Sequence, residues 1–149
     1  MIASLLIITI STALFAYWFR YTCLLILNTQ TSTDYAGEVA AANQLSFLEV
    51  QNEIPSAGRE RLAALHRSLD RDYALIGRLL QKTMGAADGG GSLEQAMLSI
   101  DFLAMKLVFK LSSRISENLA RRSLIEMTNV VAHLANSFGE QHCAENGTI

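Results

Sequence analysis

The first segment of the chain is an apolar run long enough to cross a bilayer. Residues Ile2 to Phe19 contain no charged side chain. As a helix, these about eighteen residues would extend roughly 27 Å, close to the thickness of the hydrocarbon layer. The run ends in Tyr17, Trp18, Arg20 and Tyr21, which combine amphipathic rings with a guanidinium that pairs with lipid phosphate. This pattern predicts one transmembrane helix whose end lies at the membrane interface, in contact with lipid.

Two other interpretations of this run stay open, a cleaved signal peptide and a buried core helix. A signal peptide begins with basic residues and ends in a small-residue cleavage site, and the sequence has neither feature. A second apolar stretch, Cys23 to Leu27, follows Arg20. It favours a helix that continues to about residue 28, with the Arg20 side chain extended to the headgroups.

The predicted orientation rests on one residue. Arg20 follows the apolar run, and the next basic residue is Arg59. Basic residues favour the cytoplasmic side of a membrane, and unpaired Cys143 favours a reducing compartment. We therefore expect a single-pass membrane protein whose soluble part is cytoplasmic.

Composition limits the remainder of the 149-residue chain to one small helical domain. Hydrophobic residues make up 50% and charged residues 17%, which disfavours a disordered chain or a solvated coiled-coil rod. A net charge of -2 gives no electrostatic basis for binding nucleic acid. We expect an anchor and interface segment in 1–28, an acidic juxtamembrane helix in 29–56, a helical hairpin in 57–138 and a flexible tail in 139–149.

Three helical segments and no strand are predicted after the anchor. The first runs from about Tyr35 to Glu53 and stops before Pro55, the only proline. The second continues on an apolar stripe to about Met84 and stops at the glycine loop 85–91. From there a helical pattern without Gly or Pro runs from Ser92 to Phe138. The predicted fold class is all-α.

The length of the last segment decides the expected topology. About 47 residues of helix would be roughly 70 Å long, whereas a compact domain of this size has a radius of gyration near 14 Å. We therefore expect a long antiparallel hairpin with a first arm kinked at Pro55 and a continuous second arm. Its seam would pair Leu80 with Met97, Ile76 with Ile100, Leu69 with Leu107, Leu65 with Leu111 and Leu62 with Ile115. The alternative is a compact three-helix bundle in which the last helix breaks near residues 121–123.

The last helix is apolar on two nearly opposite faces. Beside the seam residues, Leu98, Phe102, Met105 and Phe109 cluster roughly 150° away around the helix. A hairpin covers only one face, and a large exposed apolar patch marks an interaction site. We expect these four residues to bind a partner chain, unless the helix from 35 to 53 folds back over them.

No catalytic or metal-binding pattern fits the sequence. The glycine loop lacks the Lys that follows in phosphate-binding loops. His66, His133 and His142 lie on different segments without metal-ligand spacing, and Cys143 adds one ligand in a short tail. We expect no enzymatic activity, no metal, no cofactor and no small-molecule substrate.

Charge is uneven in the soluble part, which is acidic in 29–56 and basic in 57–84. A basic helix face is usually solvated, and it also suits an acidic partner or anionic headgroups. The sequence predicts a non-catalytic accessory or scaffold subunit of a larger membrane protein complex, which binds partners through its transmembrane helix and an apolar face of its last helix. The alternative is a self-associating anchored regulator whose hairpins dimerise into a four-helix bundle.

Overall fold

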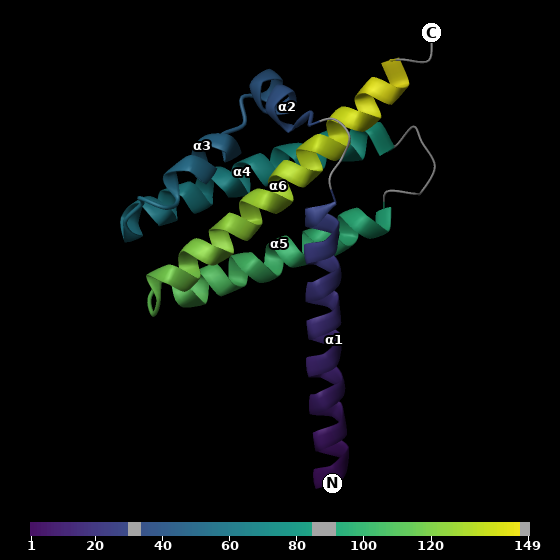
Figure 1. Cartoon of the computed structure of the whole chain (residues 1–149), viewed down its shortest axis with the longest axis vertical. Coiled ribbons are helices and arrows are strands. Elements are labelled where there is room, and N and C mark those ends of the chain that lie inside the picture. The colour runs from purple at the N-terminus through teal and green to yellow at the C-terminus, as the bar shows by residue number, and fades with distance from the viewer. Residues whose placement is uncertain (30–33, 85–91, 147–149) are drawn as a thin grey trace. The chain divides into compact units, whose positions relative to one another are not determined.

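The computed structural model describes residues 1–29, 34–84 and 92–146, and within these ranges every regular element is a helix (Figure 1). The all-α prediction is confirmed, while the predicted glycine loop 85–91 lies outside the described residues. The helices are α1 (Ile2–Asn28), α2 (Ala36–Asn43), α3 (Phe47–Glu53), α4 (Arg59–Met84), α5 (Ser92–Ser112) and α6 (Glu117–Asn146).

The chain divides into two compact units, Met1–Gln30 and Thr31–Ile149. The first unit contains α1, a helix of 27 residues with a mean hydropathy of 2.0. Among the described residues, α1 is the one helix long and apolar enough to cross a membrane. It continues past Arg20 to Asn28, as the second apolar stretch predicts.

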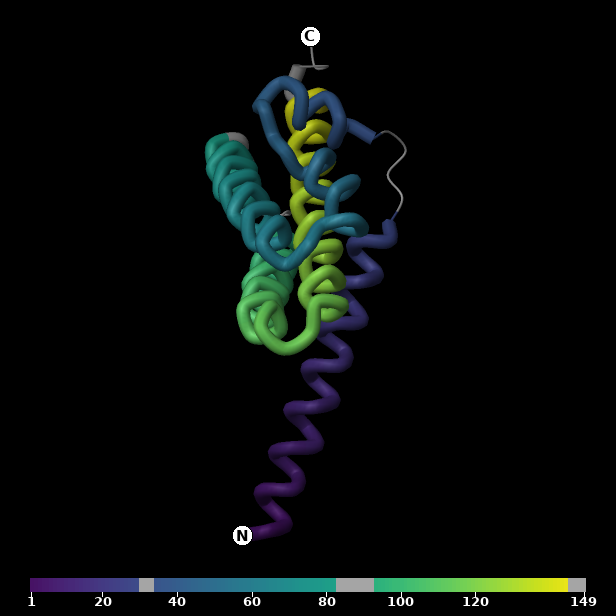
Figure 2. Tube along the Cα trace, turned by 90° about the vertical axis from the view of Figure 1, so that its left-hand side faces the viewer, coloured from purple at the N-terminus to yellow at the C-terminus, as the bar shows by residue number. Residues whose placement is uncertain are grey.

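Helix α6 is the centre of the second unit, the helical body. It contacts α2, α3, α4 and α5, whereas α5 has no close backbone approach to α2, α3 or α4 (Figure 2). Leu124, Met127, Val130 and Val131 of α6 are fully buried, because neighbours cover this helix on more than one side. The core of the body therefore forms around α6.

The prediction of one continuous helix from Ser92 to Phe138 is wrong. The chain turns at residues 113–116, and α6 folds back along α5 (Figure 1). The hydroxyl of Ser113 donates to the carbonyl of Lys110, and the amide of Ser116 donates to the carbonyl of Ser112 at 2.8 Å. Serine side chains that bond nearby backbone groups compete with helix continuation. The break therefore precedes residues 121–123, where the alternative bundle placed it and which lie inside α6.

Two further boundaries differ from the sequence prediction. The expected helix from Tyr35 to Glu53 is split, because Gln44 adopts a left-handed conformation with φ 53 after α2. Helix α3 ends at Glu53, just before Pro55. The expected flexible tail is helical as far as Asn146, since α6 continues through it.

A buried carboxylate holds the turn between α2 and α3. The Oδ2 atom of Asp72, on α4, accepts hydrogen bonds from the Ser46 amide at 2.7 Å and the Ser46 hydroxyl at 3.0 Å. The Asp72 side chain has no exposed surface. A charged acceptor satisfies both donors of the turn and favours the split over a continuous helix.

Side-chain contacts join α4 to α5, although the two backbones do not approach closely. The Lys106 ammonium contacts the Asp70 carboxylate at 2.7 Å. Asp70 follows Leu69 and Lys106 precedes Leu107, so this contact lies next to the expected pair of Leu69 with Leu107. The lengthwise alignment is therefore the expected one. Leu107 is nevertheless 59% exposed, so α5 is rotated about its own axis relative to the expectation.

Candidate functional site

The four residues expected to bind a partner lie mostly in the core of this chain. Leu98 and Phe102 have no exposed surface, Phe109 is buried, and Met105 is half-buried. The expectation that they form an exposed face is corrected, because α6 folds back and closes a core around them. Large aromatic side chains contribute the most apolar area to such a core.

Two stacked ring pairs fix this orientation of α5. The ring of Phe102 stacks on Tyr73 of α4 with centroids 3.9 Å apart, and Phe109 stacks on His66 with centroids 4.5 Å apart. These contacts join α4 to α5 at two points seven residues apart, which is two helical turns. The aromatic face of α5 is therefore the face that α4 and α6 cover.

The opposite face of α5 is exposed and apolar. Its five large side chains are between 55% and 72% exposed, and two exposed alanines lie among them. At about 100° per residue, the seven side chains fall within an arc of about 120°. We call this face the α5 stripe, and it consists of Leu93, Ala96, Ile100, Leu103, Ala104, Leu107 and Leu111.

The charged side chains on α4 and α5 are mostly basic. Among the described residues of these two helices, the exposed acids are Glu60 and Glu94, since Asp70 binds Lys106 and the other two aspartates are buried. Exposed bases are more numerous: Arg59, Arg61, Arg67, Arg71, Arg78, Lys82 and Lys110. The predicted basic strip is thus the outer face of α4, and Lys110 extends it to the border of the α5 stripe.

The three histidines lie in three different surroundings. His66 is buried against Phe109, and desolvation lowers its pKa, opposed by the nearby Asp70 carboxylate and reinforced by Lys106, Lys110 and Arg67. His133 contacts the Glu94 carboxylate at 2.8 Å and so joins α6 to α5. His142 is exposed near the end of α6. Among the described residues, no group of three or more metal-binding side chains comes together.

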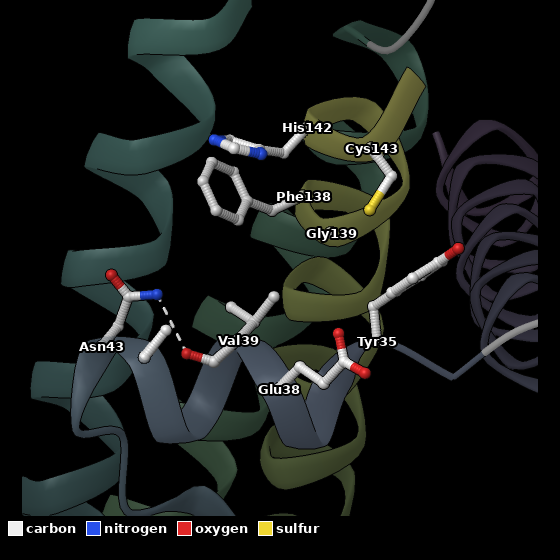
Figure 3. Close-up of a pocket in the computed structure, with 9 residues that line it drawn as sticks. Tyr35, Glu38, Val39, Asn43, Phe138, Gly139, His142 and Cys143 are labelled. Atoms are coloured by element: carbon white, nitrogen blue, oxygen red, sulfur yellow. Dashed lines mark hydrogen bonds between the residues drawn. The ribbon is translucent and has the colours of Figure 1, made fainter. Parts of the chain in front are cut away.

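A cavity of about 300 Å³ opens between α2 and the end of α6 (Figure 3). Val39, Ala42 and Phe138 give it an apolar wall, while Glu38 and Cys143 contribute polar atoms. The Asn43 amide is engaged in a hydrogen bond to the Val39 carbonyl at 2.9 Å (Figure 3). The cavity is at the small end of ligand pockets, and His142 also lines it.

Close packing beside this cavity depends on a glycine. A Cβ atom at Gly139 would overlap the Cβ of Tyr35, at the start of α2. The Tyr35 amide donates to the Asn136 side chain at 2.6 Å, which fixes the start of α2 on α6. The start of α2 is therefore packed tightly on α6 beside the cavity.

The expected interface residues form an aromatic cluster on α1. The Trp18 ring lies edge-on to Tyr17 at 6.4 Å and to Tyr21 at 6.1 Å, between ring centroids. Arg20 follows directly in the same helix turn. This combination suits the headgroup level of a bilayer. No protein family, curated protein or solved structure matches this chain.

The sequence contained a signal for the true exposed face. Serines at 112, 113 and 116 and the basic Arg114 interrupt the apolar pattern where the helix breaks. Once α6 returns along α5, the aromatic face faces inward and the Leu, Ile and Ala face is left outside. The seam residues Ile100, Leu107 and Leu111 are therefore the ones available to a partner.

Proposed function

We propose that this protein is a membrane-anchored scaffold or accessory subunit, which acts by binding rather than by catalysis. The observation that carries the proposal is the α5 stripe, an entire helix face that stays apolar and exposed on a folded body. Monomeric soluble proteins rarely expose contiguous apolar patches larger than a few hundred Å². Such a face indicates a surface that is covered when the protein works.

Helix α1 supports a location at the membrane. In this proposal α1 crosses the bilayer once, with Trp18 and Arg20 at headgroup depth. Its exposed apolar side chains then contact other membrane subunits within the bilayer. In this proposal the body lies on the cytoplasmic side, which Arg20 and the basic outer face of α4 support. The body would then be available to cytoplasmic partners of the same complex.

Native mass of the detergent-extracted protein tests this proposal. We expect the full chain to resist carbonate extraction and to co-purify with other membrane subunits. Leu14→Lys in α1 should release the chain from the membrane, because a charge at mid-bilayer is unfavourable, and Leu14→Ile is the matched control. A particle containing one copy and no other protein would contradict the scaffold.

A self-associating regulator is the second candidate, and the α5 stripe itself favours it. In an antiparallel pair of α5 helices, Ile100 of one copy would face Ala104 of the other, and Leu93 would face Leu111. The same patch would thus meet itself, with Ile100 against Ala104, as a two-fold interface between identical chains requires. A homodimer without foreign subunits in the same measurement would support this candidate.

A further inference from the structure

From the charges around it, we infer that the α5 stripe lies on the surface of an anionic lipid bilayer. The inference rests on the proposed membrane anchoring and names the occupant of the exposed face. The ligand class is lipid with a negatively charged headgroup, with acyl chains against the stripe and headgroups against the basic residues beside it.

The shape of the stripe suits an interfacial helix. Helix α5 has 21 residues and is about 31 Å long. Its exposed arc contains Leu, Ile and Ala alone, while charges begin at the borders, with Glu94 near one end and Lys110 near the other. A helix with one apolar face and basic residues beside it lies in the plane of a membrane and buries that face at the boundary of headgroups and acyl chains, and Lys110 is such a residue here.

The charge of the surroundings favours anionic lipid over a second copy. Lys110 borders the stripe, the exposed Arg114 follows in the turn after α5, and the outer face of α4 adds further arginines. In the antiparallel α5 pair described above, Lys110, on the flank that also carries Lys106, would lie level with Glu94 of the other copy, and Glu94 already contacts His133 of its own chain. Anionic headgroups complement this flank, and each Lys or Arg near such a surface changes binding about fivefold.

Because the body is attached to α1, a weak affinity of the α5 stripe for lipid is sufficient to keep the stripe on the bilayer. Residues 29–35 are all that separates α1 from α2 in the sequence, and an extended segment of that length reaches at most about 25 Å. A short tether of this kind gives an effective concentration in the millimolar range. The body of an inserted chain therefore stays within reach of the bilayer surface.

Docking through α5 would leave another side of the body open to proteins. Helices α2 and α3 pack on α6 and have no close backbone approach to α5. Their exposed side chains include the acidic Glu38 and Glu49.

Fluorescence quenching in nanodiscs tests the inference with the full chain. Cys23→Ser and Cys143→Ser remove the native thiols. Leu103→Cys then provides one thiol on the stripe, to which an environment-sensitive dye is attached. Asn129→Cys, at an exposed position of α6, is the matched control. With nitroxide-labelled lipids, we expect several-fold stronger quenching at residue 103 than at 129 in phosphatidylserine-containing discs, and a loss of that difference in pure phosphatidylcholine.

Charge variants separate lipid docking from simple apolar contact. Lys110→Glu with Arg114→Glu should lower the ratio of docked to free body by at least about twenty-five-fold, from about fivefold for each lost basic residue. Arg122→Glu, at an exposed position of α6, should leave the ratio unchanged. All three positions are exposed, so the thermal unfolding midpoint should stay the same in both variants.

The outcomes distinguish this inference from the proposed function. Failure of the chain to insert, seen as release by carbonate, would refute the anchored scaffold. Stable insertion with equal quenching at residues 103 and 129 in anionic discs would refute lipid docking alone. Efficient disulfide formation between a chain carrying Ile100→Cys and a chain carrying Ala104→Cys, with the dye at 103 shielded from lipid, would assign the stripe to a second copy and overturn the inference.

Discussion

Replacing two adjacent residues of α5 by alanine should change the stability of the body by very different amounts. Phe102 has no exposed surface and stacks on Tyr73 at 3.9 Å, whereas Leu103 is 58% exposed on the α5 stripe. Phe102→Ala should lower the free energy of unfolding of the body by about 3 to 5 kcal/mol, from lost apolar burial and the remaining cavity. Leu103→Ala should change it by no more than about 0.5 kcal/mol, as expected for an exposed position.

The assay is unfolding of the full chain in mild detergent, followed by far-ultraviolet circular dichroism. A loss of 3 to 5 kcal/mol corresponds to a decrease of about 10 to 20 °C in the midpoint for a domain of this size. It is also a large fraction of the about 5 to 15 kcal/mol that stabilises a typical domain. A neutral Phe102→Ala, or a Leu103→Ala that is the more destabilising of the two, would refute the rotation of α5 and restore the hairpin seam expected from sequence.

Three further predictions concern the body. Gly139→Ala should destabilise the body by about 1 to 3 kcal/mol in the same assay, because the new Cβ overlaps Tyr35. Its control is Gly77→Ala, which has open space around it and should stabilise α4 by about 0.5 to 1 kcal/mol. Asp72→Ala should lower the free energy of unfolding by about 2 to 4 kcal/mol, because it leaves both donors of the α2–α3 turn without their acceptor. Asp72→Asn should lower it by less, because its side-chain oxygen can still accept a hydrogen bond. Burial lowers the pKa of His66, so neutral His66 stabilises the fold above about pH 6.5. This stability is lost as the pH falls from there towards the pKa of the folded state. His66→Phe should remove that pH dependence of the unfolding free energy, measured by denaturant titrations at several pH values, and an unchanged dependence on pH would contradict it.

Local patterns were sufficient to predict the helical class and several element ends. The uncharged run and the apolar stretch after Arg20 predict the helix that ends at Asn28. Proline chemistry predicts that α3 stops before Pro55, and the start of α5 at Ser92 follows the glycine loop. These features depend on neighbours within a few residues, which is the range over which sequence patterns are informative.

The exposed face of α5 could not be assigned from such patterns. Both faces of the helix are apolar, so periodicity alone does not determine which one is buried. The choice depends on the turn at 113–116, which returns α6 to the aromatic face. The split between α2 and α3 similarly depends on Asp72, which is 26 residues from Ser46 in sequence. Contacts between distant residues decided both outcomes.

The central position of α6 has a consequence for the order in which the protein is made. Helix α6 contacts every other helix of the body, and it is synthesised after all of them. Until it leaves the ribosome, the aromatic face of α5 and the apolar face of α4 lack their main cover. Helix α1 emerges first, so in the proposed membrane-anchored protein it is available for insertion throughout that interval. Under that proposal, insertion of α1 should precede folding of the body, and the newly made chain would complete its core at the membrane.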